Sequence, residues 1–438
     1  MPVPYLSGPT VLKRWATTVP DPTTCCPPDA RHALPRRWGC TISRSAAASS
    51  RCRAKGLPRW VKLPRPWPSA KGWWRTPVLR PIAWSADLDD CIRDEIRALK
   101  AYEVPSARGM VKLDAMENPY GLPEPVRQGL AQRLAALDLN RYPDANPEAL
   151  KAALRQAMGI PSEAALVLGN GSDELIQMLA LAVAKPGAVV LGVDPSFVMF
   201  RMIATFAGMR YVGVGLRSDF SLDAPALLEA VRTERPALTF LAYPNNPTGN
   251  HFDPEAVESV IRTSPGLVVV DEAYYPFTDH SFLPRLLSHP NLLVMRTVSK
   301  LGLAGIRLGL LAGPAAVLDQ VDKVRLPYNI SVLDQAAALE VLSRPEVLQE
   351  QAARIREQRA VLAEELSRLP GVSIYPSAAN FLLFRVAQAS RVFEGLRQRG
   401  ILIKNLSAAH PLLADCLRVT VGTPEENRQF LQALQDSL

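Results

Sequence analysis

Several features common in proteins are missing from most of this 438-residue chain. No tryptophan follows Trp84, no run of 18 apolar residues occurs, and no segment repeats. A membrane-spanning helix needs an apolar run of about that length, so we expect no membrane partner. The five histidines lie far apart, without the spacing of a metal-binding motif, and we expect no metal site: they are His32, His251, His280, His289 and His410.

Cysteine is also scarce. Beyond residue 85 the chain contains only Cys91 and Cys416, which are too few and too scattered for a disulfide framework. This pattern predicts a reducing compartment, and we expect a cytoplasmic protein.

Composition divides the chain at about residue 85. The first 85 residues hold all seven tryptophans, four of the six cysteines and 14 of the 39 prolines. They carry 15 Lys and Arg against two Asp, a net charge of +13, whereas the remainder has 35 basic and 40 acidic residues, a net charge of −5. The overall charge of +8 therefore arises in the first 85 residues and gives no reason to expect nucleic-acid binding by the rest.

Three interpretations compete for residues 1–85. A targeting peptide is disfavoured because prolines interrupt every candidate amphipathic helix and no apolar core segment follows the start. A basic, tryptophan-bearing arm could bind nucleic acid or a membrane, although no known module is present. We favour a disordered tail, or upstream sequence translated from a start codon set too early, because a chain so rich in Pro and Arg cannot bury a core. The protein proper is then expected to begin near Ser85, with an amphipathic helix opening at Asp87.

Lys300 is the first candidate catalytic residue. It follows the apolar run 291–295 in a loop of small residues, with Thr297 and Ser299 before it and Arg307 seven positions on. A lone lysine after a strand is usually a solvated surface residue. A lysine that loses its proton on burial can act as a nucleophile, and the arginine fork and hydroxyls beside it suit a phosphate.

Asp271 follows the buried-strand pattern 266–270, and Tyr274 lies three residues further on. Ligands in open α/β sheets lie beyond the carboxyl ends of the strands, where both residues would be. Capping of a turn remains the alternative for Asp271, and ordinary core packing the alternative for Tyr274. A third strand, 237–242, runs into a rigid turn that contains Asn246 before a proline.

A fourth strand, 165–168, leads into glycines and then into an amphipathic helix, for which Ser172 is the predicted N-cap. Free N–H groups at a helix start bind phosphate, so Gly171, Ser172 and Asp173 are candidates to hold one. Phe197 follows the next strand and can stack on a flat cofactor. An amine, an acid, a phosphate cradle and an aromatic ring at successive strand ends together predict pyridoxal 5'-phosphate as the cofactor.

From about Asp87 onward the chain resembles the histidinol-phosphate aminotransferases, which belong to the class I/II group of fold-type I aminotransferases. Seven motifs carry this resemblance, and they occur in the family's order. They are Glu117-Asn118-Pro119-Tyr120, Arg141-Tyr142-Pro143-Asp144, Gly171-Ser172-Asp173-Glu174, Asn245-Asn246-Pro247-Thr248-Gly249, Asp271-Glu272-Ala273-Tyr274, Ser299-Lys300, and residues 417–427 from Leu417 to Asn427.

The resemblance implies a role for each cofactor residue. Lys300 would form a Schiff base with the cofactor and then move the proton from the substrate Cα. Asp271 would pair with the ring nitrogen, while Asn246 and Tyr274 would bond the phenolic oxygen. The phosphate would lie on Gly171, Ser172, Asp173, Thr297, Ser299 and Arg307. Tyr142 would reach the cofactor of a second subunit, which makes the expected protein a homodimer with shared sites. Phe197 stands where the family usually has tyrosine, so stacking is kept while a hydroxyl is lost.

The implied reaction moves an amino group between L-histidinol phosphate and 2-oxoglutarate in histidine biosynthesis, giving imidazole acetol phosphate and L-glutamate. Arg418 would bind the carboxylate of one substrate and the phosphate of the other, with Asn118, Tyr120 and Lys404 nearby. Lys404 stands where an arginine is common and supplies charge without bidentate geometry. An aromatic aminotransferase and a threonine-phosphate decarboxylase remain alternatives on this scaffold. A regulator with a DNA-binding helix-turn-helix is disfavoured because residues 1–85 contain no helical pair.

The predicted fold is α/β, with a large, mainly parallel seven-stranded sheet and a smaller α+β domain built from both chain ends. The expected divisions are residues 86–137 for the first part of the small domain, 138–326 for the cofactor-binding domain and 327–438 for the rest of the small domain.

Overall fold

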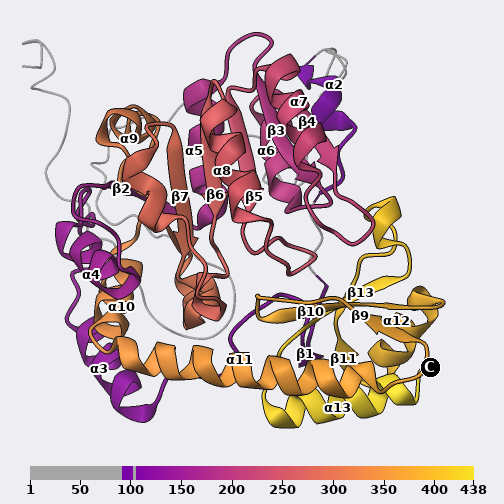
Figure 1. Cartoon of the computed structure of the whole chain (residues 1–438). Helices are drawn as coiled ribbons and strands as arrows, with labels where there is room; N and C mark the ends of the chain where they lie inside the picture. Colours follow the sequence, from indigo (N-terminus) through magenta and orange to yellow (C-terminus); the bar gives the residue numbers. More distant parts are fainter. Residues whose placement is uncertain (1–90, 102–104) are drawn as a thin grey trace, which may run out of the picture. The chain divides into compact units, whose positions relative to one another are not determined.

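This structure is a computed structural model, and it describes residues 91–101 and 105–438 (Figure 1). Its main element is a seven-stranded sheet in the order β2-β8-β7-β6-β5-β3-β4. Six of these strands run in the same direction, and β8, which lies between β2 and β7, runs in the opposite direction. The strands are β2 (Ala165–Asn170), β3 (Val189–Asp194), β4 (Arg210–Gly215), β5 (Leu238–Ala242), β6 (Leu267–Asp271), β7 (Leu292–Thr297) and β8 (Leu308–Gly313). The predicted large, mainly parallel sheet of seven strands is confirmed.

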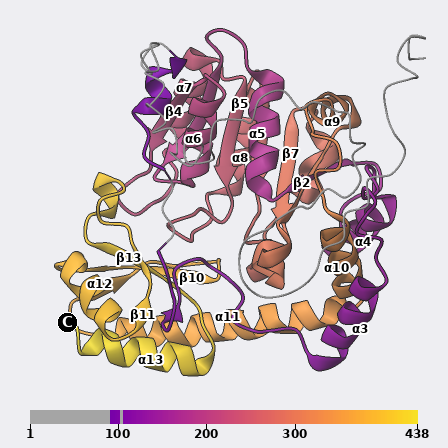
Figure 2. The ribbon, with the colours of Figure 1, turned by 180° about the vertical axis from the view of Figure 1, so that it is seen from behind.

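Helices cover both faces of this sheet because the central strands are apolar on both faces, as expected for buried parallel strands. One face packs against α5 (Ser172–Val183), α6 (Val198–Phe206) and α9 (Ala315–Asp322). The hydrophobic cluster on the other face includes side chains of α4 (Glu148–Met158), α7 (Ala224–Glu234), α8 (Pro254–Thr263) and α10 (Val332–Leu342), and α3 (Glu124–Ala135) packs on α10. Figure 2 shows the same elements from behind.

A second sheet of four antiparallel strands has the order β12-β13-β10-β9. Its strands are β9 (Val372–Ile374), β10 (Phe381–Val386), β12 (Lys404–Asn405) and β13 (Cys416–Thr420). Beside it the early strand β1 (Val111–Lys112) pairs in parallel with β11 (Ile401–Leu402), so residues from both chain ends meet here. Three helices pack on this unit: α11 (Pro345–Ser367), α12 (Ala389–Gln398) and α13 (Pro424–Gln435).

The packing of α3 and α10 bears on the division into domains. Both helices bury side chains such as Val126 and Ala338 in the hydrophobic cluster of the large sheet, although the sequence-based division places them in the small domain. We propose that the small domain consists of residues around β1 and those from the middle of α11 onward, where Ala352 and Ile355 join the other cluster. Figure 1 shows α11 running from α3 and α10 towards α13.

The N-terminal predictions lie largely outside the described residues. The proposals for residues 1–85 and for the start of the helix at Asp87 fall there, and the described part begins with α2 (Asp94–Arg97). Among the residues that the structure describes, none of the helices is long and apolar enough to cross a membrane.

Short turns of helix follow several strand ends at the carboxyl edge of the large sheet. They include η3 (Tyr275–Phe277) and η4 (Leu283–Ser288) after β6, and η5 (Ser299–Leu303) and η6 (Ala304–Ile306) after β7. The last short helix, η7 (Pro411–Leu413), precedes β13. These turns hold the side chains that follow β6 and β7 close to the sheet.

Candidate active site

The carboxyl ends of β5, β6 and β7 open into one cavity. Ten of the residues predicted from the sequence line it: Ser172, Asp173, Phe197, Asn246, Asp271, Tyr274, Thr297, Ser299, Lys300 and Arg307. They come from five segments that are separated in the chain and meet because parallel neighbouring strands end at the same edge. The structure therefore brings most of the predicted cofactor residues together.

Asp271 ends β6 and is 5 % exposed. One carboxylate oxygen, Oδ1, accepts a hydrogen bond of 3.0 Å from the N–H of Ala273. Burial raises the pKa of Asp271 to about 7, and the charges of Asp173 and Glu272 raise it too, against the lowering effects of the Ala273 bond and of Lys300. A cation beside this carboxylate would restore its charge, so Asp271 suits a protonated ring nitrogen.

Lys300 lies on η5, directly after β7. Its Nζ donates to the carbonyl oxygen of Ala115 at 3.0 Å, which fixes the position of the amine. Burial lowers the pKa of Lys300 to about 8, and the positive charge of Arg418 contributes in the same direction. A sizeable fraction of the amine is therefore neutral near neutral pH, which a nucleophile or a base requires.

The start of α5 differs from the prediction in one detail. Helix α5 begins at Ser172, and its N-cap is Gly171, which makes no side-chain capping bond. The predicted capping role of Ser172 is wrong, because Ser172 is the first residue of the helix and Gly171 holds the N-cap position. Its buried Oγ has no hydrogen-bond partner among the described residues, as expected of a hydroxyl reserved for a ligand.

Two glycines keep the space around this helix start open. A Cβ on Gly171, whose φ is +81°, would lie 2.6 Å from Nη2 of Arg307, and one on Gly309 would lie 2.9 Å from the nitrogen of Ser172. Gly171 itself does not line the cavity, and its N–H donates to Gly169 at 2.8 Å. The helix start, the free Ser172 hydroxyl and Arg307 fit the phosphate of pyridoxal phosphate.

The hydroxyls of Thr297, which ends β7, and of Ser299 also line the cavity. Thr297 Oγ1 lies 2.9 Å from Ser299 Oγ and 3.0 Å from the Leu308 carbonyl oxygen, and the N–H of Ser299 donates to it at 3.1 Å. These contacts fix both side chains, which are buried. Nη2 of Arg307 lies 3.5 Å from Oδ2 of Asp173, so the guanidinium is held near the start of α5.

The rings and the amide at the cavity wall are fixed by packing and by one hydrogen bond. Phe197 meets Phe200 edge-on at 5.5 Å between ring centroids, and Tyr274 meets Phe381 in the same way at 5.2 Å. Asn246 Oδ1 accepts a hydrogen bond of 2.5 Å from Nη1 of Arg418.

The predicted substrate residues lie around the cavity but do not line it. Arg418 on β13 is 7 % exposed and also donates to the Asp114 carbonyl oxygen at 3.0 Å. Lys404 on β12 is its cross-strand neighbour in register. Asn118 donates to the Leu301 carbonyl oxygen at 3.1 Å and accepts from the N–H of Tyr120 at 2.9 Å. Asn118 thereby ties the N-terminal segment to the residue after Lys300.

Of the predicted cofactor residues, Gly171 and Tyr142 do not line the cavity. The side chain of Tyr142 is 81 % exposed and stacks on Tyr328 with ring centroids 4.5 Å apart.

Four further residues line the cavity and were not predicted: Met116, Ala242, Pro244 and Ala273. Ala242 and Pro244 lie just before the motif that contains Asn246, and Ala273 lies within the motif that begins at Asp271. These three positions could therefore have been predicted from their neighbours in the sequence. Met116 has a φ of +53°, and its N–H donates to Thr420 Oγ1 at 3.0 Å, a contact across 304 residues that no local pattern reveals. Among the described residues, no group of three His, Cys, Asp or Glu side chains could hold a metal ion.

Comparison with known proteins agrees with this geometry. The family model for aminotransferases of class I and II matches residues 108–434. Histidinol-phosphate aminotransferase 2 of Cupriavidus pinatubonensis is 55 % identical over 356 residues, which cover 80 % of this chain and 97 % of that protein. Histidinol-phosphate aminotransferase 1 of Ralstonia nicotianae is 54 % identical over 365 residues, which cover 82 % of this chain and 98 % of that protein. The chain belongs to the histidinol-phosphate aminotransferase family.

A solved histidinol-phosphate aminotransferase shows the same fold. The enzyme from Sinorhizobium meliloti, in complex with pyridoxal-5'-phosphate, aligns with a TM-score of 0.71 and 26 % identity, covering 81 % of this chain and 98 % of that one. The predicted fold-type I aminotransferase fold is thus confirmed, and the chain is an aminotransferase. The family and this neighbour imply pyridoxal phosphate as the cofactor.

Proposed function

We propose that this protein transfers an amino group between L-histidinol phosphate and 2-oxoglutarate, forming imidazole acetol phosphate and L-glutamate, as a step of histidine biosynthesis. The observation that carries the proposal is the cavity itself. It places the amine of Lys300, with its pKa lowered to about 8, in the same chamber as the buried carboxylate of Asp271 and the open helix start at Ser172. The family membership supports the choice of substrate.

Pyridoxal phosphate, when bound, supplies an aldehyde that condenses with amines and a ring that withdraws electrons from the bonds of the attached substrate. Asp271 would hold the proton on the ring nitrogen, while Ser172, Ser299 and Arg307 would hold the phosphate. Asn246 and Tyr274 would contact the phenolic oxygen, and Phe197 would lie against the ring. Each of these residues lines the cavity.

Lys300 also serves as the base in this proposal. In that role its amine, which lines the cavity, would take the proton from the substrate Cα. A lowered pKa matters because a base works best when its pKa lies near the working pH. The bond from Nζ to the Ala115 carbonyl oxygen orients the amine for this task.

Arg418 would recognise the anionic group of both substrates. Its guanidinium is buried beside Asn246, and a planar fork suits a carboxylate and a phosphate alike. Tyr120 and Asn118 belong to the segment that leads away from Met116, and Lys404 adds charge from the strand next to Arg418. We propose these three as further contacts to the substrate.

A second copy of the chain would complete the site. Tyr142 is 81 % exposed, and Leu139 and Leu326 are exposed at 67 % and 71 %. An apolar surface of this kind around a predicted cofactor residue supports a homodimer in which Tyr142 reaches the partner's cofactor. Within the described residues, Cys91 and Cys416 form no disulfide, which supports our proposal of a cytoplasmic enzyme.

The substrate is tested by steady-state kinetics with L-histidinol phosphate, phenylalanine and threonine phosphate at equal concentrations. With 2-oxoglutarate as the amino acceptor, we expect glutamate to form fastest when L-histidinol phosphate is the amino donor. Faster amino transfer from phenylalanine would make the protein an aromatic aminotransferase. Release of CO₂ from threonine phosphate would make it a decarboxylase.

A further inference from the structure

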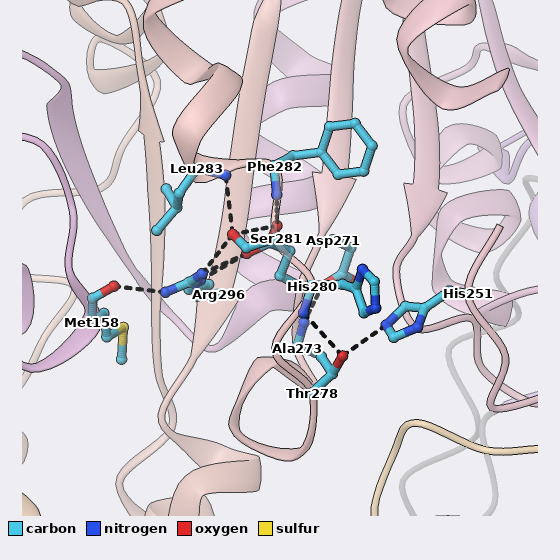
Figure 3. Close-up of polar contacts among 11 residues, drawn as sticks. Met158, His251, Asp271, Ala273, Thr278, His280, Ser281, Phe282, Leu283 and Arg296 are labelled. Atoms are coloured by element: carbon cyan, nitrogen blue, oxygen red, sulfur yellow. Dashed lines mark hydrogen bonds and ion pairs between the residues drawn. The ribbon is translucent and has the colours of Figure 1, made fainter. Parts of the chain in front are cut away.

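A buried ion pair lies directly behind the cavity. Glu272 is 0 % exposed and Arg296 is 5 % exposed. Arg296 donates from Nε and Nη2 to Oε2 of Glu272 at 2.9 and 2.7 Å. Figure 3 shows Arg296 with Met158 and Ser281, and it also labels Asp271, the residue that precedes Glu272. None of the cofactor or substrate roles proposed above uses either residue.

The alternation of side chains along a strand explains why the pair is out of reach of a ligand. Glu272 follows Asp271 at the end of β6, and Arg296 precedes Thr297 at the end of β7. Successive side chains on a strand point to opposite faces. Asp271 and Thr297 point into the cavity, so Glu272 and Arg296 occupy the other face of the same two strand ends.

Polar contacts surround the pair on every side that the structure describes. Nη1 of Arg296 donates to the Met158 carbonyl oxygen at 2.8 Å, and Nη2 also donates to Ser281 Oγ at 3.0 Å. Glu272 accepts from Ser281 Oγ at 3.0 Å and from the N–H of Phe282. The guanidinium lies 4.3 Å from the ring centroid of Tyr275. The pair thus joins β6, β7, the end of α4 and the turn before η4 (Figure 3).

A gain in folding stability does not by itself explain why the charged side chains of Glu272 and Arg296 are buried. Taking both out of water offsets most of their attraction, and apolar replacements of buried pairs are often neutral or stabilising. What the pair does achieve is geometric, because it fixes the strand end that carries Asp271 to the strand end that carries Thr297. The backbone adds one bond here, from the N–H of Glu272 to the Met295 carbonyl oxygen at 2.8 Å.

The pair also sets the charge around Asp271. Glu272 is a neighbouring negative charge that raises the pKa of Asp271, and Arg296 neutralises it from the opposite side. The other charged groups that act on Asp271 are Asp173 at the start of α5, which raises its pKa, and Lys300 on η5, which lowers it. Without Arg296, the Glu272 carboxylate beside Asp271 would lose the guanidinium that compensates its charge, whereas Asp173 would keep its contact with Arg307.

We propose that Glu272 and Arg296 are positioning residues for cofactor binding: from the reverse face of the sheet they hold the Asp271 carboxylate in place and keep its surroundings close to neutral. The inference rests on the proposed use of pyridoxal phosphate. It assigns the pair a role in the affinity and ionisation of the bound cofactor, in addition to packing.

The test compares Arg296→Met and Glu272→Gln with the wild-type protein. Apo protein is titrated with pyridoxal phosphate in equilibrium dialysis, and the absorbance of the bound cofactor is recorded as a function of pH. We expect Arg296→Met to weaken cofactor binding at least tenfold and to displace the pH at which the absorbance changes. Glu272→Gln keeps the shape of the side chain and should weaken cofactor binding less than Arg296→Met does. If Arg296→Met does not fold, the cofactor affinity and pH profile of Glu272→Gln test the proposal.

The double variant Glu272→Gln/Arg296→Met separates charge from geometry. Since it removes both charges, the pH at which the absorbance changes should return towards the wild-type value while the affinity stays reduced. Arg296→Lys should recover only part of the affinity, because lysine keeps the charge without the fork.

Arg385→Met is the matched control. Arg385 on β10 donates to the Leu412 carbonyl oxygen at 2.7 Å and lies outside the cavity lining. It should lower the thermal unfolding temperature without changing cofactor affinity or the pH profile. The inference is overturned if the Arg296 and Glu272 variants behave like this control. If the wild-type protein itself fails to bind pyridoxal phosphate, the proposed function fails instead.

Discussion

The two sides of the cavity are built in different ways. On the large-sheet side, the key residues lie at or next to the ends of regular elements: Asp271 and Thr297 end strands, Ser172 begins α5, and Lys300 lies in the short helix after β7. On the small-sheet side, Arg418 reaches Asn246 from β13, and the backbone carbonyl oxygens of Asp114 and Ala115 accept bonds from Arg418 and Lys300. The first side depends on side chains at fixed strand ends, whereas the second depends on contacts between segments far apart in the chain.

This difference separates the proposed chemistry from the proposed choice of substrate. The large-sheet side carries the amine, the acid and the phosphate cradle. The small-sheet side carries the groups that would recognise the substrate's anion. Changes on the first side should therefore abolish the reaction, while changes on the second should alter affinity and selectivity.

Replacing Lys300 should have the largest effect. Lys300→Ala removes both the amine that bonds the cofactor and the base at the substrate Cα, so we expect the rate of amino transfer to fall by more than about 10³-fold. Single-turnover absorbance changes with L-histidinol phosphate measure this loss. Lys323→Ala, at an exposed lysine whose Nζ donates to Gln320, serves as the control and should keep full activity. Normal turnover by Lys300→Ala would contradict its role.

Arg418→Lys should have an intermediate effect confined mainly to substrate affinity. The variant keeps a positive charge but loses the fork, and charged hydrogen bonds contribute about 1.5–3 kcal/mol each. We therefore expect kcat/KM for 2-oxoglutarate and for histidinol phosphate to fall by about 10- to 100-fold, while the cofactor stays bound. Cofactor loss in the variant would show that Arg418 acts through its bond to Asn246 rather than on the substrate.

The amine of Lys300 should give a characteristic pH dependence. Its pKa is lowered to about 8, and only the neutral amine attacks an aldehyde. Capture of pyridoxal phosphate by the apo protein should therefore speed up by about tenfold per pH unit below pH 8 and level off above it. Stopped-flow absorbance measures the rate, with Nα-acetyl-lysine as the reference amine. A rate that keeps rising past pH 9, as expected for an ordinary lysine, would show that the amine is not desolvated.

Phe197→Tyr should have the smallest effect. Phe197 stands where the family usually has tyrosine, and a hydroxyl at the edge of the ring can add one hydrogen bond to the cofactor. A single such bond contributes about 0.5–1.5 kcal/mol, so cofactor binding should tighten by roughly 2- to 10-fold. Equilibrium dialysis measures the change. Weaker binding would indicate that the cavity wall near Phe200 cannot accommodate the added oxygen.

The sequence predicts the large-sheet side well because its residues follow local patterns. An apolar run that ends in Asp271 or leads to Lys300 is visible within about ten residues, and the edge at which parallel strands end is fixed by topology. Of the predicted cofactor residues, Tyr142 lies apart from the cavity of its own chain, and its proposed role needs a second copy.

The small-sheet side is less accessible to such reasoning. Met116 and the Ala115 carbonyl oxygen enter the site through backbone geometry, and their contacts to Thr420 and Lys300 span more than 180 residues. The Glu272–Arg296 pair could not be predicted from the sequence for a related reason. Glu272 belongs to a predicted motif, and Arg296 lies between the apolar run 291–295 and Thr297, yet only the three-dimensional pairing of β6 with β7 shows that they meet.

The cap of α5 shows the limit of reading residue types alone. Serine before an amphipathic helix usually caps it. Here the helix begins one residue earlier than a Ser172 cap would require, since Gly171 adopts a φ of +81° and takes the N-cap position. The hydroxyl is thereby left for a ligand.

The most direct test of the account is reductive trapping of the cofactor. Protein loaded with pyridoxal phosphate is treated with borohydride, digested and analysed by mass spectrometry. We expect a phosphopyridoxyl group on the peptide that contains Lys300, and we expect no such group on the corresponding peptide of the Lys300→Ala variant. Modification of another lysine, or no modification at all, would contradict the central claim that Lys300 is the residue that bonds the cofactor.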